Sequence, residues 1–296
     1  MPDRSDVVYR YDGTFDGWLS CVFESFARGE LPLEIQPDDS EELSLFDEKY
    51  IPCDDARARR VEKGIRRKLG REPLELIRHG FLTCHPHKEL MLLRYVRLGF
   101  AEGGGALERL TDDAVYELHK AVQGLTREAH KWLGFIRFSA HGQILAAEIE
   151  PLNEVLPLIA DHFCDRFGGE AFLIHDRTHR KALVHRPGQH VILDVDELIL
   201  PDASREEEAY RQLWQRFYET IAILERINPR AQMNHMPKRY WGHLPEMAAG
   251  RIAEASESYS LTNAPADQKQ QEIPEGGRRS HDHHSRGSED PSGQGT

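Results

Sequence analysis

The sequence predicts an α+β fold, in which an antiparallel sheet of hairpins and a meander packs with several helices. Several segments repeat apolar residues every three or four positions, which is the spacing of a helix with one buried face. Between residues 134 and 195, short apolar strands alternate with turn signals. Hairpins mixed with helices are typical of α+β domains.

One domain and a tail are expected. The chain has 296 residues, a length that is enough for one large core. Apolar residues make up 39% and charged residues 30%, as in a globular protein with a polar segment attached. From about residue 248 the composition shifts to Ser, Gly, Gln, Glu, Pro and His. Such a segment buries too little apolar surface to offset its ordering entropy. We therefore expect a single α+β domain over 1–247, mostly helical over 56–130, and a disordered tail over 248–296.

The N-terminal sequence MPDRSDVVY carries charges where a signal peptide needs an apolar stretch. No apolar run reaches the ~18 residues of a membrane span. These features favour a cytoplasmic location. The sequence contains no C-x-x-C pair, and no cofactor or metal site is expected.

The first hundred residues predict a strand, a turn and a series of helices. VVYRY reads as a strand, and Phe15, Trp18, Val22 and Phe26 then form one apolar stripe of a helix. The segment 57–71 is expected to be helical with bases around most of its surface. Two more helices are expected over 74–100.

A long middle helix is expected to begin at a Thr111 cap, with Asp112 and Asp113 suited to its dipole. The sequence GFIRFSAHGQILAAEI then predicts a hairpin that turns at His141-Gly142 and sets Phe138 opposite Leu145. A helix with Val155, Ile159, Phe163 and Phe167 on one face follows.

A three-stranded meander is expected over residues 170–195. A turn at Thr178-His179 would pair Ile174 with Leu183, and a turn at Pro187-Gly188 would pair Val184 with Val191. A further helix is expected to begin at Ser204, where Glu207 completes a capping box, and to continue to Ile227.

The charge is unevenly distributed. The net charge is −12, but residues 57–71 hold eight bases and one acid, Arg66 and Arg67 among them. Phosphate binding needs such local positive charge, so this helix is a candidate DNA contact. The alternative is a solvated helix that pairs with the acidic residues 1–55.

The segment NPRAQMNHMPKRYWGHL, residues 228–244, has two interpretations. Lys238, Arg239, Tyr240 and Trp241 combine charge with stacking surface, which suits nucleic acid. Alternatively, Trp241 is buried and Arg239 forms an ion pair.

Four other polar residues are weaker candidates. His130 lies at the edge of the buried face of the middle helix, and Arg137 follows in the expected hairpin with Glu148 as its diagonal neighbour. They could border a phosphate-binding cleft, or Arg137 could simply pair with Glu148. His162 and Asp165 share one helical turn and could act in proton transfer, although a structural pair is the simpler interpretation.

The strings RYDGTFDGWLSCVFESF, EAHKWLGFIRF, HFCDRF, IHDRTHRKALVH and NPRAQMNHMPKRYW occur in that order. Together they resemble a bacterial family associated with DNA metabolism and DNA repair, built around a domain of unknown function (number 4130). The resemblance covers roughly residues 6–245. It implies a DNA-repair context and a partner protein. Genes of this family typically lie beside the gene of a radical-SAM protein, and in some genomes the domain is fused to a uracil-DNA glycosylase-like domain. It carries over no catalytic residues.

These observations favour an accessory protein of DNA repair that binds DNA, a radical-SAM partner or a glycosylase-like partner. Residues Arg66, Arg67, Arg137 and 238–241 would contact the DNA. The alternative is a hydrolase acting on nucleic acid that uses His130, His162 and Asp165. A third possibility is a protein-binding scaffold whose acidic segment 38–55 contacts a basic partner.

Overall fold

A computed structural model describes residues 3–4, 6–40, 45–195, 198, 207–214 and 233–248. These residues all belong to one compact unit, Met1–Ile252. Apart from Ala248, the expected tail lies outside the described residues. In the part of the chain that is described, no helix combines the length and apolar character needed to cross a bilayer.

The N-terminal region forms a small parallel sheet covered by helix α1 (Phe15–Arg28). Thr14 caps α1 by accepting from the backbone N–H of Gly17, and Gly29 ends it with a φ of 70°. The strand, turn and helix expected here are confirmed, whereas the parallel pairing was not predicted. The central strand β2 (Val7–Tyr11) lies between β4 (Glu34–Pro37) and β5 (Asp47–Tyr50), and β1 (Asp3–Arg4) pairs with β3 (Glu30–Leu31).

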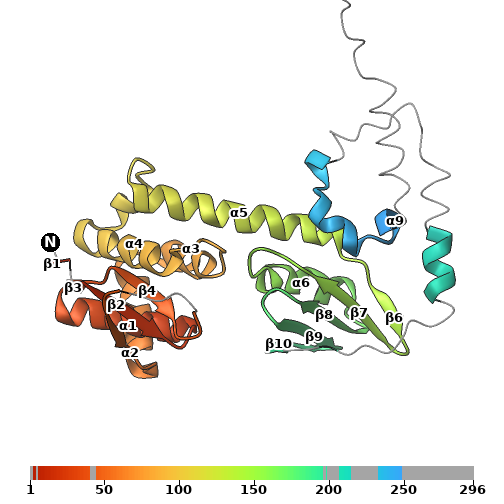
Figure 1. The fold of residues 1–296 in the computed structure, drawn as a ribbon, viewed down its shortest axis with the longest axis horizontal. Coiled ribbons are helices and arrows are strands. Elements are labelled where there is room, and N and C mark those ends of the chain that lie inside the picture. The colour runs from red at the N-terminus through yellow and green to blue at the C-terminus, as the bar shows by residue number, and fades with distance from the viewer. Residues whose placement is uncertain are drawn as a thin grey trace, which may run out of the picture. The chain divides into compact units, whose positions relative to one another are not determined.

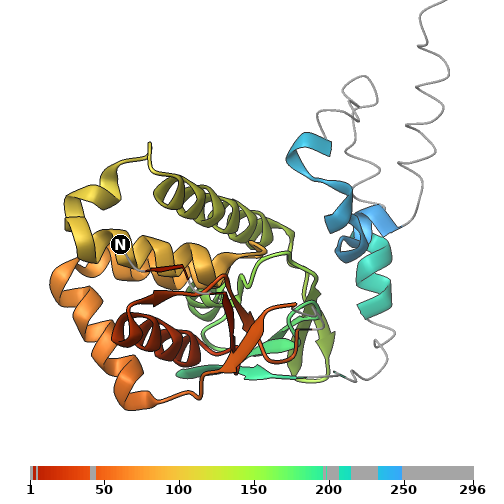
Figure 2. The same cartoon turned by 60° about the vertical axis from the view of Figure 1, so that its left-hand side comes forward.

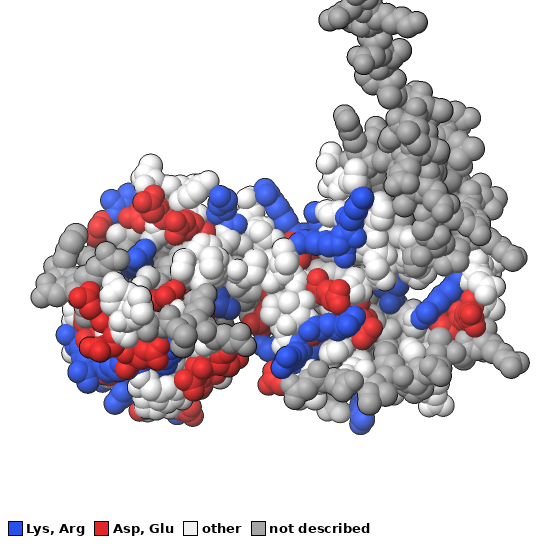
Figure 3. Space-filling view, in the orientation of Figure 1, with Lys and Arg blue, Asp and Glu red and all other residues white. Residues whose placement is uncertain are grey.

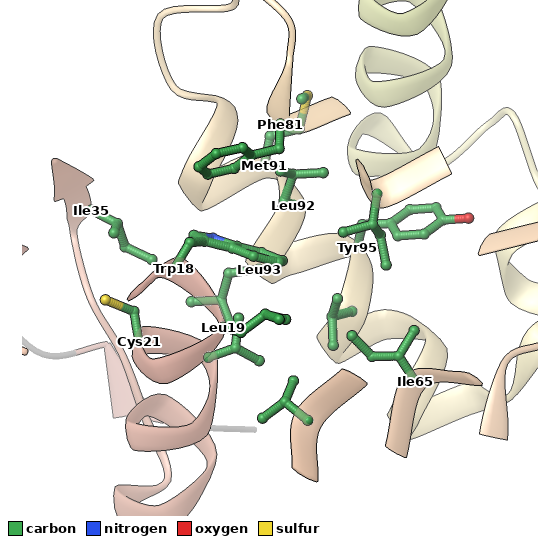
Figure 4. Packing of buried hydrophobic residues seen from close by; sticks show 14 of the residues in the cluster. Trp18, Leu19, Cys21, Ile35, Ile65, Phe81, Met91, Leu92, Leu93 and Tyr95 are labelled. Carbon is green, nitrogen blue, oxygen red and sulfur yellow. The ribbon is translucent and has the colours of Figure 1, made fainter. Parts of the chain in front are cut away.

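Three helices and a 3-10 turn follow: α2 (Asp55–Lys68), α3 (Arg71–Phe81), α4 (Lys88–Glu102) and η1 (Gly104–Glu108). Helix α2 lies beside α1 (Figures 1 and 2). Trp18 is fully buried among side chains of α3 and α4, and Ile65 reaches the same core from α2 (Figure 4).

Helix α5 (Asp113–Phe135) contributes to two hydrophobic clusters. Val115 and Leu118 belong to the N-terminal cluster, and Trp132 belongs to a second one with α6 and the larger sheet. Asp112 caps α5 by accepting from the N–H of Ala114, so the predicted cap at Thr111 is one residue early.

The larger sheet has the order β10-β9-β8-β7-β6 and is mixed, so the expectation of a purely antiparallel sheet is wrong. Helix α6 carries the chain back between β7 and β8, and a crossover of this kind makes the two strands parallel. The bounds are β6 (Ser139–His141), β7 (Ile144–Ile149), α6 (Leu156–Arg166), β8 (Ala171–Asp176), β9 (Lys181–Arg186) and β10 (Gln189–Asp194).

The meander register is confirmed, with Ile174 opposite Leu183 and Val184 opposite Val191. The first hairpin is different: Leu145 pairs with Ala140 instead of Phe138. Gly142, with a φ of 66°, takes the first of the two central turn positions, where a type II′ turn requires glycine. The pairing is therefore displaced by two residues from the prediction.

The last described segments are a helix at 207–214, η3 (Lys238–His243) and α9 (Pro245–Ala248). Residues 207–214 agree with part of the helix expected from Ser204 to Ile227. The rest of that expected helix, including the Ser204 cap, lies outside the described residues.

Candidate nucleic-acid interface

An open groove of about 1210 Å³ lies between α1 and α2, with one residue of α4 in its wall. We call it the basic groove. No Asp or Glu is among the described residues that line it. Its cations are Arg59, Arg60, Lys63, Arg67 and Lys68, and its aromatic side chains are Phe23, Phe26 and Phe100.

The pattern of α2 explains why its cations face this groove. Ala58, Val61 and Ile65 are buried, so they fix one face of the helix against the core. Asp54 caps the N-terminus by accepting from the backbone N–H groups of residues 56 and 57, and the last turn is basic. Both features complement the helix dipole. Because the apolar face of α2 is turned to the core, the bases occupy its exposed face. Figure 3 shows Lys and Arg side chains beside acidic ones in this region.

Some of these cations are paired and others are not. Arg57 lies 3.6 Å from Glu24 and 3.3 Å from Asp54, and Arg59 lies 3.9 Å from Asp55. The predicted alternative, pairing with the acidic N-terminal residues, therefore holds for part of the helix. By contrast, Arg60, Lys63, Arg66, Arg67 and Lys68 have no ion-pair partner among the residues described.

The aromatic wall lies within reach of the same cations. The guanidinium of Arg60 lies 5.7 Å from the ring centre of Phe23, and the ammonium of Lys68 lies 4.9 Å from that of Phe100. Phe26 is 39% exposed, and its ring centre is 5.3 Å from that of Phe100. The groove thus combines positive charge with accessible ring surface.

The two DNA contacts predicted on α2, Arg66 and Arg67, are both exposed, but only Arg67 lines the basic groove. Phe26 was expected only as part of an apolar stripe, and Phe23, Phe100, Arg60 and Lys63 were not named as expected contacts. The spacing of four between Arg59, Lys63 and Arg67 is the signal that could have indicated a row of cations on one face.

The Lys238–Trp241 segment is largely engaged in packing and internal bonds. Tyr240 is fully buried, with its ring centre 4.8 Å from that of Trp132 and 4.9 Å from that of Phe135. Burial raises the pKa of the Tyr240 phenol, and the nearby Arg239 partly opposes this effect. This geometry supports the interpretation that the segment covers the core.

The neighbouring side chains make mixed contacts. Arg239 lies 3.1 Å from the carboxylate of Glu128 and donates to the Tyr240 hydroxyl at 2.7 Å. The indole of Trp241 is half-buried and donates to the carbonyl of Met236 at 3.0 Å, while Lys238 is exposed and lies 5.8 Å from the Trp241 ring centre.

Arg137 follows the C-terminus of α5 and donates to the carbonyl of Gly134 at 2.8 Å. Because β6 begins only at Ser139, Arg137 is not in the strand that would place it diagonal to Glu148. The Glu148 carboxylate instead lies 3.5 Å from Nδ1 of His175. His130 is exposed on α5.

His162 and Asp165 are both exposed on α6, and no hydrogen bond or ion pair links them within the described ranges. A different His–Asp pair occurs at the β8–β9 turn, where Nδ1 of His179 lies 2.7 Å from the buried carboxylate of Asp176. Among described residues, no group of three or more His, Cys, Asp or Glu side chains is arranged to hold a metal ion.

The fold and the groove define an α+β protein that carries a cationic, aromatic groove on its N-terminal helices. A family described as a domain of unknown function, DUF4130, matches residues 86–246. The chain belongs to this family. No curated protein matches the chain. The matched region contains Phe100 and the 238–241 segment, whereas the other groove residues precede it.

Proposed function

We propose that this protein is an accessory protein of DNA metabolism or repair that binds nucleic acid in the basic groove. The observation that carries the proposal is that five cations of α2 line one groove whose described lining contains no acid. Polyanion binding gains from such a cluster because each phosphate contact releases condensed counterions.

The net charge of the chain makes association with a polyanion depend on the groove. With a net charge of −12, the chain as a whole repels a polyanion, so association depends on the local potential at α2. Arg60, Lys63 and Arg67 are well suited to the role, because binding a phosphate does not require them to leave an acidic partner in the described structure.

The test is DNA binding by the full chain over a salt series from about 50 to 200 mM. We expect measurable affinity at low salt, with log K falling linearly as log salt rises. The triple variant Arg60→Ala/Lys63→Ala/Arg67→Ala should lose most of the affinity, and its salt slope should be smaller by about 2–3, near one per lost contact.

Arg66 provides a matched control for Arg67. The two are adjacent, exposed and without an ion-pair partner in the described part, but Arg66 does not line the groove. Arg67→Ala should weaken binding more than Arg66→Ala. No binding at low salt, or equal behaviour of the triple variant and the wild type, contradicts the proposal.

We also propose that the protein acts with a partner, either a radical-SAM protein or a uracil-DNA glycosylase-like protein. The support is the resemblance of the sequence motifs, together with the net negative charge of the sequence outside α2, which is suited to contacts other than DNA. The test is whether the full chain and each candidate partner purify together as a complex, at low and at high salt. Absence of a complex under both conditions, with and without DNA, contradicts it.

A further inference from the structure

The two walls of the basic groove differ in chemistry. All five cations come from α2, whereas α1 and α4 supply phenylalanines and small apolar side chains. A duplex presents its phosphates outward and stacks its bases inside, so it could engage only the cationic wall. A single strand presents phosphates and base faces together, and proteins bind it with charged grooves and aromatic platforms.

We propose that the basic groove is a binding site for single-stranded nucleic acid, with the phosphate backbone along α2 and unstacked bases against Phe26 and Phe100. This inference rests on the proposed function, and it adds which form of nucleic acid enters and which side chains receive the bases.

The cations of α2 form two rows along the helix. Arg59, Lys63 and Arg67 are four residues apart, so they repeat every ~6 Å along the axis. This outer row can follow a sugar–phosphate backbone from one phosphate to the next. The second row has the same spacing but contains a gap: Arg60, then Gly64, then Lys68.

Gly64 is not required by the backbone or by packing. Its φ is not positive, and a Cβ at this position would meet only Cζ of Phe100, at an ordinary van der Waals distance of 3.8 Å. A glycine inside a helix costs about 0.5–1 kcal/mol relative to alanine. Its effect on the groove is to leave space between Arg60 and Lys68, beside Cζ of the Phe100 ring.

The rings already hold flat or cationic groups in the free protein. Arg60 lies over Phe23, Lys68 over Phe100 and Arg97 over Phe26 at 4.8 Å, and Phe26 still remains 39% exposed. A base can replace Lys68 over the Phe100 ring, and the displaced ammonium is then free to contact the adjoining phosphate. The volume of about 1210 Å³ also exceeds the ~300–1,000 Å³ typical of sites for single small molecules, which suits a polymer.

The experiment measures fluorescence anisotropy of a labelled single-stranded DNA of about 16 nucleotides and of the matching duplex at low salt. We expect the single strand to bind at least about tenfold more tightly. Phe26→Ala and Gly64→Leu, which remove a platform and fill the gap, should each weaken single-strand binding by about tenfold and leave duplex binding nearly unchanged.

Gly124→Leu in α5 is the matched control and should retain single-strand binding, because Gly124 is exposed, does not line the groove, and a Cβ there would meet nothing within 4 Å. Circular dichroism of every variant checks that α2 is intact. Equal binding of duplex and single strand, or unchanged binding by both Phe26→Ala and Gly64→Leu, overturns this inference while the proposed function stands. Binding of neither DNA overturns both.

Discussion

Arg239 of η3 and Glu128 of α5 form an ion pair at 3.1 Å in which the carboxylate is 3% exposed. Glu128 also accepts from the backbone N–H groups of Leu152 and Asn153 and from the side-chain amide of Asn153. One buried carboxylate thus joins three segments that lie far apart in the sequence. Arg239 was a predicted DNA contact, and this ion pair also gives it a role in stability. Experiments can separate this role from DNA binding.

We expect Glu128→Ala to destabilise the fold by about 3–5 kcal/mol, because it leaves the N–H groups of Leu152 and Asn153 without their acceptor. Arg239→Ala should cost less, about 1–2 kcal/mol, since Glu128 keeps three other donors. Urea denaturation midpoints measure both. If Arg239→Ala reduces DNA affinity but leaves the midpoint unchanged, the main role of Arg239 is in binding.

Tyr240 gives a second test of the same segment. Its ring packs between Trp132 and Phe135, and its hydroxyl accepts from Arg239. Tyr240→Ala should cost about 3–5 kcal/mol through the cavity it leaves. Tyr240→Phe keeps the ring and should cost only about 0.5–1.5 kcal/mol. Thermal unfolding compares the two, and similar losses would contradict a packing role.

The sequence predicted features that depend on local pairing. The register between Ile174 and Leu183 follows from a short turn, residues 177–180, and from the alternation of apolar residues, so the sequence predicts it directly. The parallel pairing of β7 with β8 depends on where α6 returns the chain, which no local pattern specifies. Gly142 occupies the first central position of the turn and not the second, as was predicted, and this difference displaces the register of the first hairpin by two residues.

The groove was only half predictable for a similar reason. The cations of α2 were evident as a run of bases, whereas Phe26 belonged to the same apolar stripe as Trp18. In the structure Trp18 is fully buried and Phe26 is 39% exposed, because the stripe extends beyond the core. Periodicity indicates which residues share a helix face, but not where along the helix the covering elements end.

Two glutamates should respond to pH in opposite ways. Burial raises the pKa of Glu89, which accepts from the Tyr11 hydroxyl at 3.0 Å. The contribution of Glu89 to stability is therefore present below its ordinary pKa of 4.5 and is lost as the pH rises through its folded value. Hydrogen bonds from Arg28 and Lys49 lower the pKa of Glu24, so its contribution is present above 4.5 and is lost in acid.

Accordingly, Glu89→Gln should gain stability relative to the wild type as the pH rises from 4.5 towards neutral, because the buried charge is removed while an acceptor for Tyr11 remains. Glu24→Gln should be less stable than the wild type throughout this range, and the deficit should shrink as the pH falls below 4.5, where the wild type loses the contribution of Glu24. Urea midpoints from below pH 4.5 to neutral measure both differences. Parallel trends for the two variants would show that the two carboxylates do not differ in this way.

Gly64→Ala should stabilise the free protein by about 0.5–1 kcal/mol, because alanine loses less backbone entropy in a helix and its methyl group has room. A matched comparison is Gly80→Ala in α3, where a Cβ would lie 2.5 Å from a methyl carbon of Leu118 and 2.7 Å from one of Leu92. That variant should be destabilised by about 1–3 kcal/mol through overpacking. Differential scanning calorimetry should therefore show a higher melting temperature for Gly64→Ala and a lower one for Gly80→Ala. A lower melting temperature for Gly64→Ala would mean that α2 requires the glycine for its own structure, and the gap facing Phe100 would then need no explanation from binding.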